Sequence, residues 1–357
     1  MNHTHCSRRG FLALGGGIAL SGCIGGSGRD GTAGGSGDEF GSVTLLLNWN
    51  MSGLHVPYVA ARENGFYEEE GFADVEIENG DGADFAANQA GLGNVEFAIS
   101  SADQILAVNA EELSPVSVGI VMQRNPNVVF ADRNSFGRLD DPERLEGATV
   151  GSGPGMVRTM TEAFLDHHGV LDGVEYVDTG FDTVQQVLNG DVDAAGGVFS
   201  DVVDAEHQGG EIDVLEIESA VASYGHLVAT DRRFAERNAD AVSGFLRATA
   251  RGTAWAAENP DEAIDHLVDV HPELEETREN QAAKWERMYA EYLLSDAVEA
   301  DGWGASGSGP WTETYETLSA ADAIENDVDP ESVWTNEYLD GDAEYVSDFA
   351  ERVRSNA

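Results

Sequence analysis

Cysteine and lysine are almost absent from this chain of 357 residues. The two cysteines, Cys6 and Cys23, lie near the N-terminus, and the single lysine is Lys284. Beyond Cys23 the sequence therefore offers no disulfide, no thiolate metal site and no cysteine nucleophile. Schiff-base chemistry would have to use Lys284, and the sequence contains no nucleophile elbow, Walker motif or histidine-rich metal spacing. We expect no catalytic residue, no metal and no cofactor.

The sequence also lacks an apolar segment of the ~20 residues that a membrane-spanning helix requires. Its apolar run at residues 11–20 is shorter, rich in Gly and Ala, and follows Ser7-Arg8-Arg9, a pattern typical of a twin-arginine export signal. The run ends in Leu20-Ser21-Gly22-Cys23, which resembles a lipobox. We predict a signal peptide at residues 1–22 and lipid attachment at Cys23. Residues 23–41 are Gly/Ser-rich and are expected to form the anchor and a flexible tether.

Basic residues are few, and the acidic excess is large. The chain has 66 Asp and Glu against 19 Lys and Arg, a formal net charge of -47. Such a field repels nucleic acid and anionic membrane surfaces, so we exclude nucleic acid as a partner. The acidic residues are spread along the chain and do not cluster, which favours adaptation to salt over a cation-binding site. Concentrated salt screens the self-repulsion, and we interpret this surface as that of a halophile's protein.

The remaining roughly 315 residues suffice for two domains of ordinary size. Short apolar runs alternate with amphipathic patterns, which predicts α/β units with mainly parallel sheets. The first set of expected strands lies at residues 43–49, 73–78, 95–99, 116–122 and 226–230. The second set lies at residues 128–131, 148–151, 174–177, 192–196 and 214–217. Helices are expected between them, at residues 55–69, 85–90, 102–111, 156–168, 181–189 and 202–208.

After residue 232 the pattern is almost entirely helical. The expected helices cover residues 239–258, 261–270, 274–294, 311–321 and 344–353. We predict that this extension packs back on the first lobe. The predicted lobes are residues 42–127 together with 226–357, and residues 128–225.

Several stretches resemble one known family, in chain order and over roughly residues 43–340. They are Leu47-Asn48-Trp49 with His55-x-Pro57-Tyr58; Ala61-Arg62-Glu63-Asn64-Gly65-Phe66-Tyr67; Ile99-Ser100-Ser101-Ala102-Asp103; Leu145-x-Gly147-x-Thr149-Val150-Gly151; Val177-Asp178-x-Gly180-Phe181-Asp182; Leu188-x-Gly190-x-Val192-Asp193-Ala194; and Trp334-Thr335-Asn336-Glu337. The chain resembles the solute-binding proteins of ABC importers for thiamine-pyrimidine precursors, nitrate, sulfonates and taurine, here as a haloarchaeal lipoprotein. The resemblance implies a type II periplasmic-binding-protein fold, with two α/β lobes, two crossing strands and a ligand in the cleft.

Ligands of open α/β sheets bind outside the carboxyl ends of the strands, and this rule selects loops of the first lobe. The strand at residues 43–49 ends in Asn48 and Trp49, and the next helix begins at His55. The Trp49 ring could stack on a planar ligand, and the Asn48 amide could bond its exocyclic groups. The alternative for Trp49 is an ordinary core anchor. His55 is expected to have a pKa lowered by the helix N-terminus, and it either bonds the ligand or caps the helix.

The third strand of this lobe ends at Ser100 and Ser101. Hydroxyl and backbone N–H groups at a helix start suit an acceptor atom or an anion. Asp103 and Gln104 follow on the first helical turn, where they either bond an amine of the ligand or cap the helix. The sequence leaves these two roles equally open.

The second lobe offers five further candidate residues in three segments. Gly153 and Met156 belong to a glycine-rich turn at a helix N-terminus, where free amides could meet a polar group, although such turns also occur without a ligand. Phe199 and Asp201 follow the strand at residues 192–196, where Phe199 could cover the other ring face and Asp201 could pair with an amino group. Tyr224 precedes the return strand and either lines the hinge or packs in the core.

From these features we expect capture of a small planar heteroaromatic solute, such as hydroxymethylpyrimidine or formylaminopyrimidine, by closure of the lobes. Delivery to an ABC permease with its ATPase subunits would follow, with the protein monomeric and lipid-anchored at the extracellular face of the cell membrane. An alkanesulfonate, taurine or nitrate is the alternative ligand. Two departures from the family leave the ligand open: the turn at Gly153 lacks the acidic residue that some members carry, and Val198-Phe199 stand where an aromatic pair is expected.

Two other functions are compatible with the fold. A fungal pyrimidine synthase resembles this family and is expected to use pyridoxal phosphate, a lysine and a cysteine-rich iron motif; this chain has neither a lysine near the predicted cleft nor a cysteine beyond Cys23. A sensor or adhesin that reuses the fold would suit the anchor and tether as well.

Overall fold

The computed structural model describes residues 40–153 and 155–356. Within them the chain forms two five-stranded sheets. The strand order of the first sheet is β2 (Phe72–Glu78), β1 (Gly41–Leu46), β3 (Phe97–Ser100), β10 (Leu227–Asp231) and β4 (Pro115–Ile120). The order of the second is β7 (Glu175–Asp178), β6 (Thr149–Ser152), β8 (Ala194–Val198), β5 (Asn127–Asp132) and β9 (Ile212–Glu216). The two sheets therefore repeat one topology.

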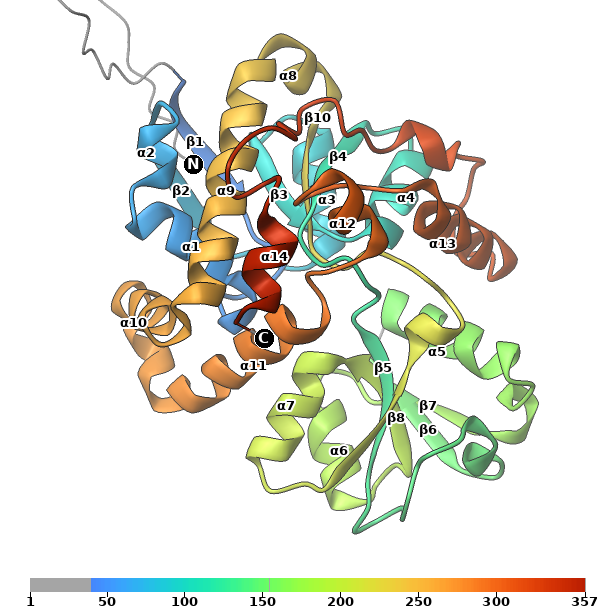
Figure 1. The fold of residues 1–357 in the computed structure, drawn as a ribbon. Coiled ribbons are helices and arrows are strands. Elements are labelled where there is room, and N and C mark those ends of the chain that lie inside the picture. The colour runs from blue at the N-terminus through green and yellow to red at the C-terminus, as the bar shows by residue number, and fades with distance from the viewer. Residues whose placement is uncertain (1–39, 154, 357) are drawn as a thin grey trace, which may run out of the picture. The chain divides into compact units, whose positions relative to one another are not determined.

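Two crossing segments join the sheets. Residues 121–126 lead from β4 to β5, and residues 217–226 lead from β9 back to β10 (Figure 1). In each sheet the strand that arrives from the other sheet runs antiparallel to its neighbours: β10 between β3 and β4, and β5 between β8 and β9. The other pairs are parallel. The predicted two-lobed α/β fold with two crossing strands is confirmed.

Helices cover both sheets. Those of the first sheet are η1 (Gly53–His55), α1 (Val56–Glu63), α2 (Phe66–Glu69), α3 (Ala83–Gly91) and α4 (Ala102–Ala110), where η marks a 3-10 helix. Those of the second are η2 (Pro142–Leu145), α5 (Met156–His167), η3 (Leu171–Gly173), α6 (Thr183–Asn189), α7 (Phe199–His207) and η4 (Ile217–Ser219). The extension contains α8 (Arg232–Arg237), α9 (Ala239–Glu258), α10 (Pro260–Val270), η5 (Pro272–Thr277), α11 (Arg278–Glu291), α12 (Asp296–Asp301), α13 (Ser308–Ala320), η6 (Pro330–Ser332) and α14 (Phe349–Arg354).

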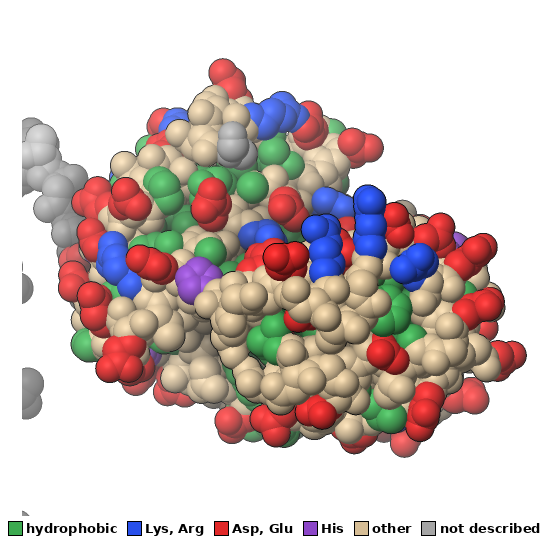
Figure 2. Space-filling model, turned by 90° about the horizontal axis from the view of Figure 1, so that it is seen from below, with side chains coloured by type: hydrophobic (Ala, Val, Ile, Leu, Met, Phe, Trp, Pro, Cys, Tyr) green, Lys and Arg blue, Asp and Glu red, His purple; other side chains and the backbone are tan. Residues whose placement is uncertain are grey.

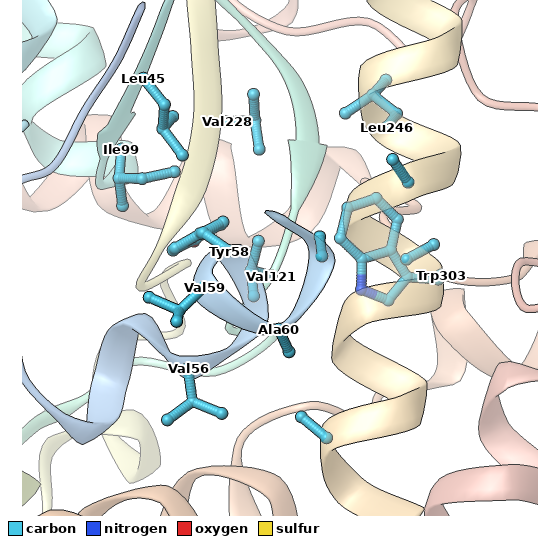
Figure 3. Packing of buried hydrophobic residues seen from close by; sticks show 14 of the residues in the cluster. Leu45, Val56, Tyr58, Val59, Ala60, Ile99, Val121, Val228, Leu246 and Trp303 are labelled. Carbon is cyan, nitrogen blue, oxygen red and sulfur yellow. The ribbon is translucent and has the colours of Figure 1, made fainter. Parts of the chain in front are cut away.

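The largest apolar core lies between the first sheet and the helices α1 and α9. Figure 3 shows side chains of the sheet, such as Leu45 and Val228, together with Val56 of α1 and Leu246 of α9. Because α9 and α14 both pack here (Figure 1), the helical extension belongs to the body of the first sheet. This burial fixes the carboxyl ends of β1 and β3.

The C-terminal tail protects the open edge of the first sheet. The Ser117 N–H of edge strand β4 donates to Val333 O at 2.9 Å, and the Thr335 N–H donates to Ser117 O at 2.9 Å. Asn336 Oδ1 accepts from the Ser306 N–H at 3.0 Å and anchors the tail from the other side. Covering an edge in this way removes a template for strand addition, which gives the late Trp-Thr-Asn stretch a structural role.

Several elements differ from their sequence-based bounds. The single helix expected at residues 55–69 is broken at Gly65, whose φ of 74° is left-handed and separates α1 from α2. The helix expected at 202–208 begins already at Phe199. The predicted helix at 274–294 begins as the 3-10 segment η5 and becomes α-helical at Arg278. The short helices α8 and α12 were not predicted.

The predicted export signal, Cys23 and almost all of the tether lie outside the described residues. The last two tether residues are part of the fold, since the Phe40 ring lies 5.2 Å from that of Phe72 and Gly41 begins β1. No helix of the described residues is both long and apolar enough to cross a membrane. Within the same residues, no three His, Cys, Asp or Glu side chains are grouped so as to hold a metal ion. Acidic side chains are scattered over the face shown in Figure 2.

Candidate functional site

A cleft of about 800 Å³ lies where the strand ends of the two sheets face each other, within the size range of small-molecule sites. It is lined by the loop after β1, the start of α4, both crossing segments, and the turns before α5, α6 and α7. Predicted site residues that line it are Asn48, Trp49, Ser101, Asp103, Met156, Phe199 and Tyr224. The cleft therefore lies outside the carboxyl ends of strands in both sheets, as the rule for open α/β sheets predicts. We call this the strand-end rule.

Two exposed aromatic rings face each other across this cleft. Trp49, from the loop after β1, is 47% exposed, and Phe181, from the turn before α6, is 86% exposed. Their ring centroids are 6.4 Å apart and the rings are inclined by only 25°. Trp49 is therefore not a core anchor. Phe181 was not among the predicted site residues, although it lies in the turn that follows β7, where the rule that ligands bind outside strand ends could have selected it.

Phe199 does not provide the second aromatic face. As the first residue of α7 its side chain is only 2% exposed, and its ring stacks on Tyr292 with centroids 4.3 Å apart. It touches the cleft wall while packing in the core. The side chain that faces Trp49 belongs instead to Phe181.

Carboxylates supply the charge of the cleft. Asp81, Asp84 and Asp103 line it, and no Arg or Lys is found among the described lining residues. Asp103 is 9% exposed, and burial raises the pKa of its carboxyl. Its Oδ2 accepts from Gln104 Nε2 at 3.3 Å. The wall at the start of α4 therefore suits an amine more than an anion.

A buried polar chain supports Asn48 from behind. His55 Nε2 lies 2.9 Å from Asn48 Oδ1, and Asn48 Nδ2 lies 3.1 Å from His226 Nε2. His55 is 1% exposed and does not line the cleft, whereas His226 does. The pKa of His55 is lowered, as expected, but burial is the largest cause, followed by His226, rather than the helix N-terminus. Burial also lowers the pKa of His226 to about 4.

Three other predicted residues stand behind the lining. Ser100 is fully buried, and its hydroxyl donates to Ala83 O at 2.9 Å, which holds the loop before α3. Gly153 lies against the turn that carries Phe181, since a Cβ at this position would lie 3.1 Å from Gly180 O. Asp201 caps α7, because its Oδ2 accepts the Val198 N–H at 2.8 Å. Burial raises the Asp201 pKa to about 6.

Tyr224 combines packing with a place in the wall. It is 3% exposed, and its hydroxyl accepts the Gly307 N–H at 2.9 Å. Its backbone O accepts the Ala102 N–H at 3.2 Å, which satisfies the first amide of α4 from within the chain. One donor that an anion could use at this helix N-terminus is therefore already engaged.

Asn125 ties the two crossing segments together and was not predicted. It is fully buried; its N–H donates to Glu218 Oε2 at 2.8 Å, and its Nδ2 donates to Val221 O at 2.9 Å. Asn125 and Asn127 also line the cleft. The crossing segments and the cleft therefore share residues.

Comparison with known proteins settles the family. Residues 53–263 match the family described as NMT1/THI5 like, which is more than half of the chain. The chain belongs to the NMT1/THI5-like family. The predicted recognition is confirmed at this level, and the matched segment contains His55, Asp103, Phe181 and His226.

Proteins that are similar to this chain carry different names. A formylaminopyrimidine-binding protein of Halalkalibacterium halodurans is 27% identical over 312 residues, which cover 83% of this chain and 90% of the relative. A 4-amino-5-hydroxymethyl-2-methylpyrimidine phosphate synthase of Legionella pneumophila is 28% identical over 249 residues, covering 65% and 74%. The periplasmic aliphatic sulphonate binding protein SsuA of Escherichia coli superimposes with a TM-score of 0.66 at 14% identity, covering 85% and 94%. That structural likeness establishes the periplasmic-binding-protein fold.

Proposed function

We propose that this protein is a solute-binding protein that captures a small planar heteroaromatic molecule between Trp49 and Phe181. The observation that carries the proposal is the nearly parallel pair of exposed rings in a cleft whose described lining contains carboxylates and no Arg or Lys. The named binding relative, for formylaminopyrimidine, supports a thiamine pyrimidine precursor as the ligand class.

The spacing of the rings favours a flat ligand. A ring sandwiched between two others needs about 7 Å between the outer rings, since each contact takes about 3.5 Å. The observed centroid separation of 6.4 Å is close to this value. A small relative movement of the walls would admit one aromatic ring and exclude water from both of its faces.

The charge of the cleft favours a neutral or cationic ligand over a sulfonate, taurine or nitrate. An anion needs cationic or amide donors, and Asp81, Asp84 and Asp103 would oppose it. Arg158, the basic residue nearest to the turn at Gly153, is paired with Glu162 at 2.8 Å and lies outside the lining. An amino group would find acceptors on the same wall.

A synthase activity like that of the Legionella relative finds no support in the lysine of this chain. Lys284 lies on α11, with Nζ 2.8 Å from Asp204 Oδ1, and it is not among the cleft residues. No other lysine exists in the sequence. Pyridoxal phosphate, which needs a lysine for its Schiff base, therefore does not fit these residues.

We further propose that the lobes at residues 42–127 with 226–357 and at residues 128–225 close around the ligand, and that the closed form delivers it to an ABC permease. Lipidation of Cys23 would hold the protein at the outer face of the membrane. Replacing Cys23 by Ser is expected to move the protein from the membrane fraction to the medium. Retention in the membrane would contradict the anchor.

The acidic surface is proposed as an adaptation to salt. Screening of the self-repulsion requires a Debye length of about 3 Å, as at molar ionic strength. The melting temperature is expected to fall when KCl is lowered from molar to millimolar concentration. An unchanged melting curve would refute this reading.

Isothermal titration calorimetry in molar KCl tests the ligand class. Hydroxymethylpyrimidine, formylaminopyrimidine, taurine, nitrate and an alkanesulfonate would each be titrated into the full-length protein. The proposal expects heat from at least one pyrimidine and none from the anions. Binding of taurine or a sulfonate without binding of either pyrimidine would contradict the heteroaromatic ligand and would indicate a sulfonate-type ligand.

A further inference from the structure

Asn48 is held between two buried histidines, and this arrangement fixes the direction of every hydrogen bond in the chain. The Ser52 N–H lies 3.1 Å from His55 Nδ1. A backbone N–H can only donate, so His55 Nδ1 is the acceptor. Burial keeps His55 neutral by lowering its pKa, and a neutral imidazole carries one proton. That proton is therefore on His55 Nε2.

The orientation of the Asn48 amide follows from this proton. His55 Nε2–H needs an acceptor and finds Asn48 Oδ1 at 2.9 Å. The amide nitrogen is then directed to His226, where Nδ2 donates to Nε2 at 3.1 Å. Because Nε2 accepts, the neutral His226 ring carries its proton on Nδ1. Nδ1 has no hydrogen-bond partner among the described residues.

The two ends of the amide therefore have different surroundings. Oδ1 faces His55, which lies behind the lining, and Nδ2 faces His226, which lines the cleft. One Nδ2 hydrogen is engaged by His226, and among the described residues Nδ2 has no second hydrogen-bond partner. We propose that His55 and His226 are positioning residues that turn Asn48 donor-outward, so that the site selects ligands with an acceptor atom, a ring nitrogen or a carbonyl oxygen, at this position.

This inference rests on the proposed function and narrows the class of ligand. The donor of Asn48 is complemented by the carboxylate of Asp103 on the same lobe. A planar ring that carries both an acceptor nitrogen and an amino group satisfies both, as an aminopyrimidine does. A ring with donors alone would leave the Asn48 N–H unpaired in a desolvated site, which is costly.

The tautomers can be measured without any ligand. The ¹⁵N shifts of histidine imidazoles distinguish protonated from unprotonated nitrogens, and His55→Gln and His226→Gln variants assign the signals in the full-length protein at pH 7. We expect the proton on Nε2 in His55 and on Nδ1 in His226. A His226 ring protonated at Nε2, or at both nitrogens, overturns the inference.

Calorimetry with hydroxymethylpyrimidine tests the positioning role. Gln at position 226 keeps an acceptor for Asn48, so His226→Gln is expected to lower the affinity less than about threefold, and His226→Leu about tenfold. Equal losses in the two variants contradict positioning. If the unsubstituted protein binds no pyrimidine at all, the proposed function fails, and the tautomers still decide the inference.

A ligand analogue separates the acceptor requirement from shape. In (2-amino-4-methylphenyl)methanol both ring nitrogens of hydroxymethylpyrimidine are replaced by CH, while the amine and hydroxyl remain. We expect it to bind about tenfold more weakly than the pyrimidine, and this difference to disappear in Asn48→Ala. A difference that survives in Asn48→Ala overturns the assignment of Asn48 as the donor that reads the acceptor.

Discussion

The two walls of the cleft are built differently. On the wall of the first sheet, Asn48 is fixed by two buried histidines, and its loop is held by the Met51 N–H, which donates to Asn79 Oδ1 at 2.9 Å. On the wall of the second sheet, Phe181 is 86% exposed and follows Gly180, whose φ of 59° is left-handed. One wall is preorganised by polar contacts, and the other presents an aromatic face on a turn.

We propose that this difference gives the walls two roles. The preorganised wall would read the hydrogen-bonding pattern of the ligand at little cost in ordering. The second wall would cover the ligand when the lobes move about the crossing segments, and a ligand that touches both walls would favour the closed state. Buried titratable groups occur in both walls, and their pKa values shift in opposite directions: His226 lines the first wall, and Asp201 lies behind the second.

Of the predicted effects, the largest is that of acid on the stability contributed by His226 and Asp201. The folded pKa of His226 is about 4, below its unfolded value, so its stability contribution is complete above pH 6.5 and is lost as the pH falls towards 4, by about 3 kcal/mol. Asp201 is raised to about 6, so its contribution has the opposite sign: it is gained as the pH falls through 6. Urea unfolding at pH 7 and pH 4 should show that His226→Gln resists acid better than the unsubstituted protein, and Asp201→Asn less well. The same pH dependence of the free energy of unfolding in all three proteins would show that His226 and Asp201 do not differ in this way.

Removing Trp49 should cost the most affinity. Trp49→Ala deletes the larger ring of the pair, and the loss of a base-stacking face corresponds to about 2 kcal/mol, or about 30-fold in Kd for a pyrimidine ligand. Leu92→Ala, which truncates another exposed apolar side chain outside the cleft, is the control and should leave Kd unchanged. An unaltered Kd in Trp49→Ala would mean that the ligand does not stack on this wall.

Phe181→Ala should have a smaller effect on affinity. Its ring is smaller and more exposed than Trp49, so we expect about 1 kcal/mol, or about fivefold in Kd, mainly as faster dissociation. Stopped-flow fluorescence of the pyrimidine complex measures both rate constants. A larger loss than in Trp49→Ala would reverse the roles of the walls.

The smallest expected effect concerns the contact of α7 with α11. Lys284 pairs with Asp204 at 2.8 Å, and its side chain is 12% exposed. Lys284→Met removes the charge and keeps the stem, so the free energy of unfolding should fall by no more than about 1 kcal/mol. The exposed pair Arg158–Glu162 provides the control, since Arg158→Gln should change it by only a few tenths of a kcal/mol. Equal changes in the free energy of unfolding for the two variants would show that the Lys284–Asp204 pair stabilises the fold no more than the exposed pair does.

Features that depend on local sequence pattern could be predicted from the sequence. Helix α9 has the predicted bounds, residues 239–258, and the strand-end rule located Asn48 and Trp49 because it depends only on where β1 ends. The same rule selects several turns of the other lobe, that of Phe181 among them, but it does not say which of these turns faces Trp49. The sequence favours Phe199 as the second ring face, whereas in the structure α7 begins early and the Phe199 ring is buried on Tyr292. His226 gave no pattern signal, because its role comes from β10 lying beside β3.

Asp201 shows a second limit of prediction from the sequence. In the sequence, a carboxylate after a strand is equally compatible with a ligand contact and with a helix cap, and only the start of α7 decides between them. The hydrogen bond from the Val198 N–H assigns it to the cap. Asp103, also at a helix start, lines the cleft.

A crystal structure of the complex with formylaminopyrimidine, grown in molar KCl, would show whether a flat ring binds between the two walls. We expect the pyrimidine ring between Trp49 and Phe181, with an acceptor atom on Asn48 Nδ2. A ligand bound outside this ring pair, or an anion at the start of α4 in its place, would contradict this expectation.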